Sequence, residues 1–261
     1  MSEPVEHKDN TEEISEEQQV ADLISKAKNG DAAAQSYLGM RYEMGWSVPE
    51  SYKDAMNWYR MSAEQGHSPS QVNLGDMYYF GRGTQQSYTK AMKWYKSAAE
   101  QGELMAQCRL GTMYEKGEGV EQSYTEAAKW YRMAAEQGEP GAQSVMGWLC
   151  YEGEGVEQSY SEALGWWQKA AEQEDIDAQY NLGSMYEKGE GVEQSYETAL
   201  KWYMAAAERE DPDAQFAIGS MYEEGRGVQQ SVDEAKKWYL LAADMDHEEA
   251  QARLEALNRI P

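Results

Sequence analysis

The sequence predicts an all-α fold, a superhelix (solenoid) of six 36-residue helix–turn–helix repeats with a capping helix at each end. Two observations predict it. Three residue types recur every 36 residues without slippage, and the segments between them have helical periodicity. The recurring residues are Gly39, Gly75, Gly111, Gly147, Gly183 and Gly219, then Ala55, Ala91, Ala127, Ala163, Ala199 and Ala235, and Trp58, Trp94, Trp130, Trp166, Trp202 and Trp238.

The first half of each unit predicts a helix that ends at glycine. In the third unit Ala106, Leu110 and Tyr114 are spaced i, i+4 and i+8, which places them on one helical face. Gly117 and Gly119 follow, and glycine readily adopts the left-handed conformation that ends helices. We therefore expect a turn at these glycines.

The second half of each unit predicts another helix. Ser123 and Glu126 have the S-x-x-E spacing of a capping box, which recurs at Ser159 with Glu162 and at Ser231 with Glu234. Tyr131 belongs to the apolar stripe of this helix, and Trp130 beside it is expected to be a core aromatic. Gly138 is a candidate end of the helix, but Glu174 and Glu210 replace this glycine later, so those corners are expected to turn differently.

These signals divide the chain into nine segments. We expect an acidic disordered tail at 1–18, an N-terminal capping helix or half repeat at 19–30, and repeats at 31–66, 67–102, 103–138, 139–174, 175–210 and 211–246, followed by a C-terminal capping helix at 247–261.

Composition and charge limit the function. The net charge is −24, which disfavours nucleic acid and anionic membranes and favours a basic partner. With two cysteines, no apolar run near the length of a membrane span and no secretory signal at the start, a cytoplasmic protein is expected. We expect no cofactor.

The repeat resembles a known family. The third unit reads Ala106-Gln107-Cys108-Arg109-Leu110-Gly111-Thr112-Met113-Tyr114, then Gly117-Glu118-Gly119-Val120, then Ala127 to Gly138 as A-A-K-W-Y-R-M-A-A-E-Q-G. This pattern resembles Sel1-like repeats, relatives of tetratricopeptide repeats. The resemblance implies a right-handed superhelix that acts as a protein-binding scaffold or adaptor.

The sequence offers little for catalysis. His7, His67 and His247 are the only histidines, and the last two are 180 residues apart, so a catalytic triad is not expected. Cys108 and Cys150 are interpreted as inert thiols within the first helices of their repeats. Glu172, Glu174, Asp175 and Asp177 crowd one junction, which we interpret as a solvated acidic corner rather than a metal site.

The resemblance also implies that the first helix of each repeat lines a concave groove. Candidate partner-binding residues are those offset from the core stripe; packing between repeats is the alternative role for the aromatics. The aromatic candidates are Tyr79, Phe80, Trp148, Tyr151, Tyr180 and Phe216, and the acidic candidates are Glu43, Glu115, Glu187 and Glu223.

The sequence therefore predicts a non-catalytic, monomeric scaffold that binds a protein or peptide in this groove, and its acidic residues favour a basic partner. Two alternatives stay open. One is a hydrolase, following the β-lactamase label of cysteine-rich relatives, and the other is a structural protein that self-associates through its ends.

Overall fold

The computed structural model describes residues 15–259, and all regular structure in this range is helical, which confirms the all-α solenoid class. The chain divides into two compact units, 1–106 and 107–261, each considered separately below. Most of the predicted acidic tail lies outside the described residues. Its last residues do not, because helix α1 begins at Glu16 and runs to Lys28.

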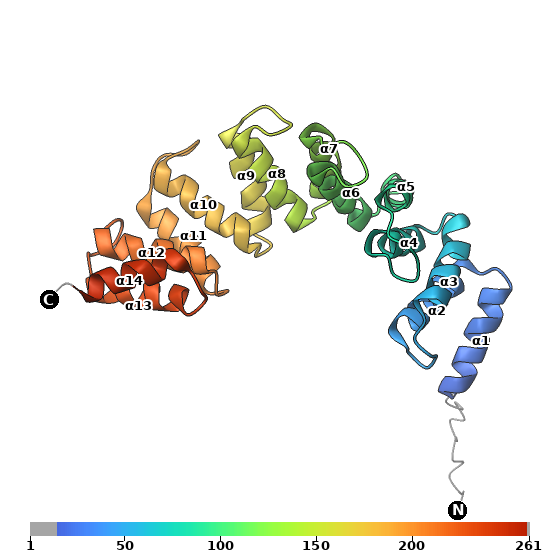
Figure 1. Cartoon of the computed structure of the whole chain (residues 1–261). Helices are drawn as coiled ribbons and strands as arrows, with labels where there is room; N and C mark the ends of the chain where they lie inside the picture. Colours follow the sequence, from blue (N-terminus) through green and yellow to red (C-terminus); the bar gives the residue numbers. More distant parts are fainter. Residues whose placement is uncertain (1–14, 260–261) are drawn as a thin grey trace, which may run out of the picture. The chain divides into compact units, whose positions relative to one another are not determined.

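Within each unit, consecutive helices form antiparallel pairs (Figure 1). The first unit contains α1 (Glu16–Lys28), α2 (Ala32–Met44), α3 (Tyr52–Glu64), α4 (Ser68–Phe80) and α5 (Tyr88–Ala99). Helix α6 (Leu104–Lys116) begins before the boundary and ends in the second unit. The second unit continues with α7 (Tyr124–Glu136), α8 (Pro140–Glu152), α9 (Tyr160–Ala171), α10 (Ile176–Lys188), α11 (Tyr196–Ala207), α12 (Pro212–Glu224), α13 (Val232–Ala243) and α14 (Glu248–Asn258). Across the described residues, no helix has both the length and the apolar character that crossing a bilayer requires.

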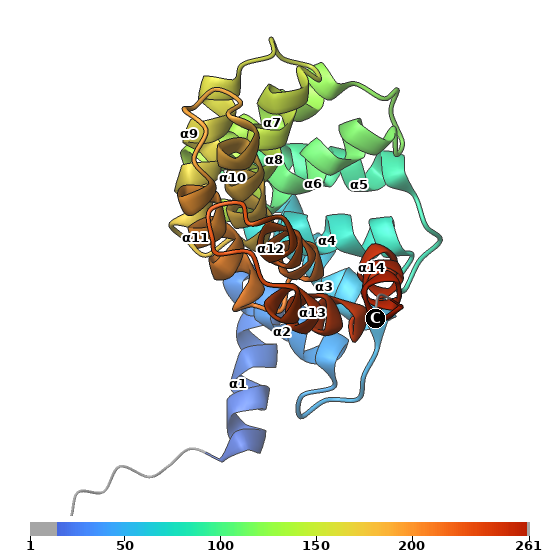
Figure 2. The ribbon, with the colours of Figure 1, turned by 90° about the vertical axis from the view of Figure 1, so that its left-hand side faces the viewer.

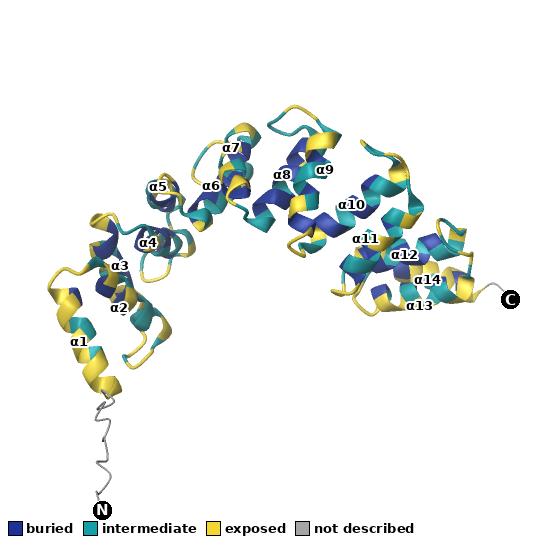
Figure 3. Cartoon of the chain, turned by 180° about the vertical axis from the view of Figure 1, so that it is seen from behind, coloured by how far each residue is buried: buried dark blue, intermediate teal, exposed yellow. Residues whose placement is uncertain are grey.

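The core of each repeat is a large aromatic side chain placed over a glycine. Gly111 on α6 has no side chain, and the ring of Tyr131 on α7 fills the space, so that a Cβ on Gly111 would lie 2.7 Å from Tyr131 Cε1. The same contact joins Gly75 to Tyr95 and Gly183 to Tyr203. The glycine recurs every 36 residues because the two helices of each pair approach closely there. Dark blue segments of the ribbon in Figure 3 mark the buried residues.

The core aromatic is not the one that the sequence predicts. Tyr131 is 5% exposed, whereas the neighbouring Trp130 is only half-buried. The partly buried Trp94 and Trp238 pack instead against core clusters that include residues of the preceding repeat. The expectation that Trp130 is a central core residue is thus wrong: its position covers a junction between repeats, while Tyr131 fills the interior of its own repeat.

The serine caps form, with half of the predicted capping box. The Ser123 hydroxyl accepts a 3.2 Å hydrogen bond from the Glu126 backbone N–H. The Ser123 N–H, however, donates to the Tyr114 carbonyl at 2.8 Å, which ties the turn back to the end of α6. Ser159 and Ser231 behave in the same way, donating to the carbonyls of Cys150 and Tyr222. The serine therefore begins the second helix and closes the turn before it.

The corners between repeats all turn alike, contrary to expectation. Glu174 and Glu210 adopt φ of 67° and 64°, the left-handed conformation that Gly138 adopts at the equivalent position with φ of 95°. The backbone hydrogen bonds are also equivalent, since Glu174 N–H donates to Ala171 just as Gly138 N–H donates to Ala135. The stacking of repeats thus imposes the turn even where the residue disfavours it.

Buried glutamines join successive helix pairs, a feature that the sequence analysis missed. The Gln143 side-chain amide donates to the carbonyl of Ala135 at 3.0 Å, near the end of the preceding helix. Its oxygen accepts from Gln173 at 2.9 Å. Gln35 and Gln71 make the same pair of contacts in the first unit. These amides satisfy the carbonyls at helix ends that would otherwise be buried without a partner.

Candidate partner-binding site

The predicted site residues all lie on first helices of the repeats, but their surroundings differ. Tyr151 packs against Tyr160 and Trp167, with ring centroids 5.2 and 5.5 Å away, and donates a 2.6 Å hydrogen bond to Glu190. Phe216 stacks on His247 at 4.8 Å and contacts Tyr239 at 5.4 Å. The Tyr151 ring therefore packs within its own repeat and reaches the next repeat through Glu190, whereas the Phe216 ring packs between its own repeat and His247.

Two predicted aromatics in the first unit form a pair. Tyr79 contacts Phe80 at 4.8 Å and Tyr88 at 5.1 Å. Phe80 is 47% exposed, and the guanidinium of Arg82 lies 5.1 Å from its ring centroid. This pair is thus partly covered by its own repeat.

Trp148 is an exposed aromatic residue on a first helix of the second unit. It is 38% exposed. It lies one residue after Gly147, and the equivalent residues of the other repeats are Met40, Asp76, Thr112, Ser184 and Ser220. Because four of the five are small or polar, the fold does not require an indole here.

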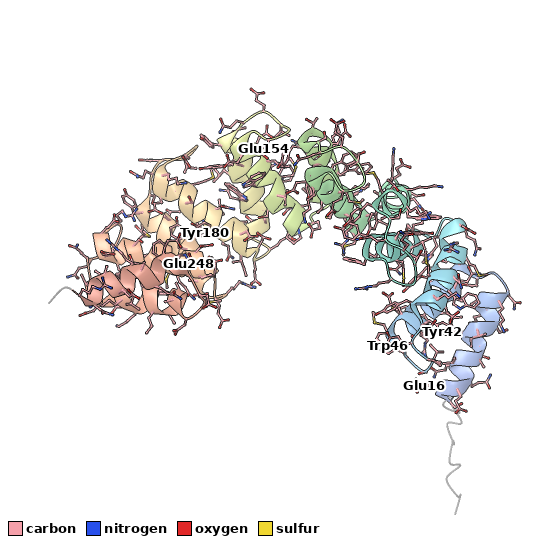
Figure 4. The ribbon with its side chains drawn as sticks, in the orientation of Figure 1. Glu16, Tyr42, Trp46, Glu154, Tyr180 and Glu248 are labelled. Atoms are coloured by element: carbon pink, nitrogen blue, oxygen red, sulfur yellow. The ribbon has the colours of Figure 1, made fainter. Side chains whose placement is uncertain are left out.

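Three predicted residues meet at one cavity. Glu115 of α6, Trp148 of α8 and Tyr180 of α10 line a hollow of about 340 Å³ together with Ser144, Val145, Asp177 and Asn181. Figure 4 labels Tyr180 on α10. Helices α8 and α10 are adjacent first helices, and the pairs α10–α11 and α12–α13 continue the series (Figure 2). We call this hollow the Trp148 cavity.

The predicted acids are not equally available. In each of the four repeats that carry these acids, the buried tyrosine donates to the acid: Tyr59 to Glu43 at 2.8 Å, Tyr131 to Glu115 at 2.7 Å, Tyr203 to Glu187 at 2.6 Å and Tyr239 to Glu223 at 2.8 Å. The carboxylate and the burial together raise the pKa of each phenol, burial contributing most. Each of the four carboxylates is therefore held in position by a hydrogen bond from a neutral phenol.

Arginines neutralise three of these four acids. Arg82 pairs with Glu43 at 3.3 Å, and Arg226 pairs with Glu187. Arg253 of α14 holds Glu223 with two contacts of 2.9 and 2.6 Å. Within the described residues Glu115 has no such cation, so its charge faces the Trp148 cavity.

Several carboxylates of α10, α12 and their N-caps lie near the residues that line this cavity. Burial and the charges of Asp175 and Asp213 raise the pKa of Asp177. Burial, with Asp213, Asp211 and Glu187, raises the pKa of Tyr180. Asp177 at the edge of the Trp148 cavity is thus surrounded by other carboxylates.

Both cysteines are protonated thiols, and two carboxylates of the acidic junction have partners within the chain. Cys150 is fully buried, and burial together with Glu162 raises its pKa to about 11. Burial and Glu139 raise the pKa of Cys108 to about 12. At the acidic junction, Asp175 caps α10 and Glu174 pairs with Arg209. Within residues 15–259 no group of His, Cys, Asp and Glu is arranged to hold a metal ion.

A larger hollow at the start of the chain was not predicted. It measures about 540 Å³ and lies between α1 and the turn after α2, lined by Glu16, Glu17, Val20, Ala21, Ile24 and Ser47. Trp46 in the same turn is 53% exposed. Its indole is the departure from the repeat pattern that could have indicated this surface, because the other repeats have Glu or Arg at that position.

Comparisons with known proteins agree with the geometry. A search of the curated proteins gives no match. The Sel1 repeat family model matches residues 32–67, 68–103, 104–139, 140–175, 176–211 and 212–247, each match beginning one residue after the repeat predicted above.

Two solved structures share this fold. The protective antigen c5321 of uropathogenic Escherichia coli is 39% identical, with a TM-score of 0.86 over 90% of this chain and 50% of that one. The chain thus spans half the length of the antigen. A Sel1 repeat protein from Oxalobacter formigenes is 32% identical, with a TM-score of 0.74 over 87% of this chain and 90% of that one. Sel1 repeat proteins are generally non-catalytic protein–protein interaction scaffolds. With six matched repeats and these two likenesses, the chain belongs to the Sel1 repeat family.

Proposed function

We propose that this protein is a non-catalytic interaction scaffold that binds a segment of a partner protein on the first helices of its second unit, at the Trp148 cavity. The observation that carries the proposal is the 38% exposure of Trp148 beside a hollow that the fold does not fill. Aromatic side chains in such hollows dominate the binding energy of protein interfaces.

The charges around the cavity support a basic partner segment. Glu115 and Asp177 line it, and the chain has a net charge of −24. Such a surface speeds the association of a positively charged segment and orients it. The monomeric state and the cytoplasmic setting remain predictions from the sequence.

Trp148→Ser is the variant that isolates the binding role. Serine occupies the equivalent position in two other repeats, at Ser184 and Ser220, so the fold should tolerate it. Tyr151 is also one of the candidates from the sequence, but Tyr151→Ala is a poor probe because Tyr151 packs against Trp167. Leu240→Ser is the matched control, since Leu240 is a 50% exposed apolar residue on α13 that does not line the cavity.

The experiment is selection of phage-displayed random 12-residue peptides on the immobilised full-length chain. Peptides selected on the wild type should bind the Leu240→Ser chain equally and the Trp148→Ser chain about tenfold or more weakly, as expected of an interface hot spot. Circular dichroism and thermal melting establish that both variants are folded. Equal binding of the peptides to all three folded chains would remove the basis for the proposal.

A further inference from the structure

The repeats carry a pairing across 39 residues, between the first helix of one repeat and the turn of the next. Glu43 pairs with Arg82 and Glu187 with Arg226, while Tyr151 donates to Glu190. Each of these is a complementary pair, acid with base or donor with acceptor. The register of the repeats sets these partners, since every pair spans the same interval.

One pair breaks this rule. The residue 39 positions after Glu115 is Glu154, in the turn after α8 (Figure 4), where Arg82 and Arg226 stand in their repeats. Both carboxylates act on the Tyr124 phenol and raise its pKa, Glu154 more than Glu115. One Glu154 oxygen, Oε2, is buried and accepts no hydrogen bond from the described residues. The position that holds a guanidinium opposite Glu43 and Glu187 thus holds a second acid opposite Glu115.

We infer that the Trp148 cavity binds an arginine side chain of the partner, whose guanidinium pairs with Glu115 where the chain's own arginine is missing. The inference rests on the proposed function, because it names the chemistry of the partner at the same site. Two features of the site fit this occupant. Glu115 is held in place by the Tyr131 hydroxyl at 2.7 Å, and the exposed ring of Trp148 offers a face on which a guanidinium can stack.

Arginine fits better than lysine for reasons visible in this chain. The three equivalent acids are all paired with arginine, at Arg82, Arg226 and Arg253. Arg253 donates to both oxygens of Glu223, a bidentate geometry that an ammonium group cannot reproduce. Asp177 at the edge of the cavity adds a second negative charge toward the same cation.

The test uses N-acetyl-arginine N-methylamide as the probe, with the lysine and citrulline compounds as matched alternatives. The readout is the indole N–H signal of Trp148 in a ¹H–¹⁵N spectrum of the full chain, identified by its loss in Trp148→Ser. The arginine compound should shift this signal saturably, and the other two should bind about tenfold or more weakly. Equal shifts from all three compounds, or none from arginine, would overturn the inference.

Glu154→Arg tests the missing pair itself. The new side chain should pair with Glu115 as Arg82 pairs with Glu43, and it should weaken binding of the arginine compound about tenfold or more. Glu157→Arg, an exposed residue of the same turn, makes the same change in charge and should leave binding unaltered. Glu115→Gln provides a second route to the same loss without adding a side chain. Retained binding in both folded Glu154→Arg and Glu115→Gln chains would contradict the proposed contact.

The peptide selection separates this inference from the proposed function. If binding of the selected peptides requires Trp148 and the peptides are enriched in arginine, the proposed binding surface and the arginine inference are both supported. If they depend on Trp148 but show no enrichment in arginine, the arginine inference fails and the proposed binding surface stands. If no peptide depends on Trp148, both fail.

Discussion

The ring of Tyr131 lies directly over Gly111, so close that a Cβ on the glycine would meet Tyr131 Cδ1 at 2.8 Å. Because the ring is buried in the interior of the repeat, neither helix can move apart without opening the core. The same relation recurs at each repeat with Tyr or Trp, which explains the strict interval of this glycine.

Gly111→Ala should therefore destabilise the protein by about 1–3 kcal/mol, the usual cost of overpacking a filled core. Gly165→Ala is the matched control, since Gly165 is also helical and a Cβ there would meet nothing within 4 Å. It should stabilise the protein by about 0.5–1 kcal/mol through helix propensity. Urea denaturation measures both changes, and similar effects of the two substitutions would contradict the packing described.

Tyr131→Ala should cost more stability than Trp130→Ala, although tryptophan is larger. The Tyr131 side chain is almost fully buried, so its removal should cost about 3–5 kcal/mol. Trp130 is half-buried and should cost less. Thermal melts of the two single variants decide the order, and a greater loss for Trp130→Ala would reverse our assignment of the core aromatic.

Glu210→Gly should stabilise the protein by about 1 kcal/mol. Glu210 has φ of 64°, a conformation that disfavours any residue with a Cβ. Gly138→Ala at the equivalent corner, where φ is 95°, should lose stability instead. Chemical denaturation of both variants is the measurement. A loss of stability in Glu210→Gly would mean that its side chain makes a favourable contact outweighing the strain.

Stability should fall as the pH rises above about 9, in part because of the two cysteines. Burial raises the pKa of Cys150 from 9.0 to about 11 and that of Cys108 to about 12, so the folded chain keeps these protons where the unfolded chain releases them. Their contribution is complete below the unfolded pKa and is lost as the pH rises through the folded values. The raised pKa values of the buried phenols act in the same direction.

Denaturation at pH 8 and pH 10.5 measures this loss. A chain with both Cys108→Ala and Cys150→Ala should lose less stability over the interval than the wild type. At pH 8 Cys150 should react with iodoacetamide about a hundredfold more slowly than a free thiol and Cys108 about a thousandfold more slowly, because little thiolate is present. Equal losses in the two chains would show that the thiols contribute nothing.

The sequence was sufficient to predict the helices, the 36-residue period and the first-helix positions of the candidate site. It did not distinguish Trp130 from Tyr131, because neighbouring aromatics have nearly the same periodicity and only the docking over Gly111 selects one. It placed Glu43, Glu115, Glu187 and Glu223 in one class. An acid of this set is neutralised only where an arginine lies in the turn 39 residues later or on α14. These arginines reach the acids only in the folded chain, where the repeats stack.

The pairing across 39 residues means that repeats of equal length are not interchangeable. Loss of the 36 residues 140–175 would bring Glu190 to the place of Glu154, and Glu115 would again face an acid. Loss of two units would bring Arg226 there, and the new neighbour would satisfy Glu115 from within the chain. Gain or loss of whole units during the history of such a gene can therefore create or erase a ligand pocket while every helix stays intact.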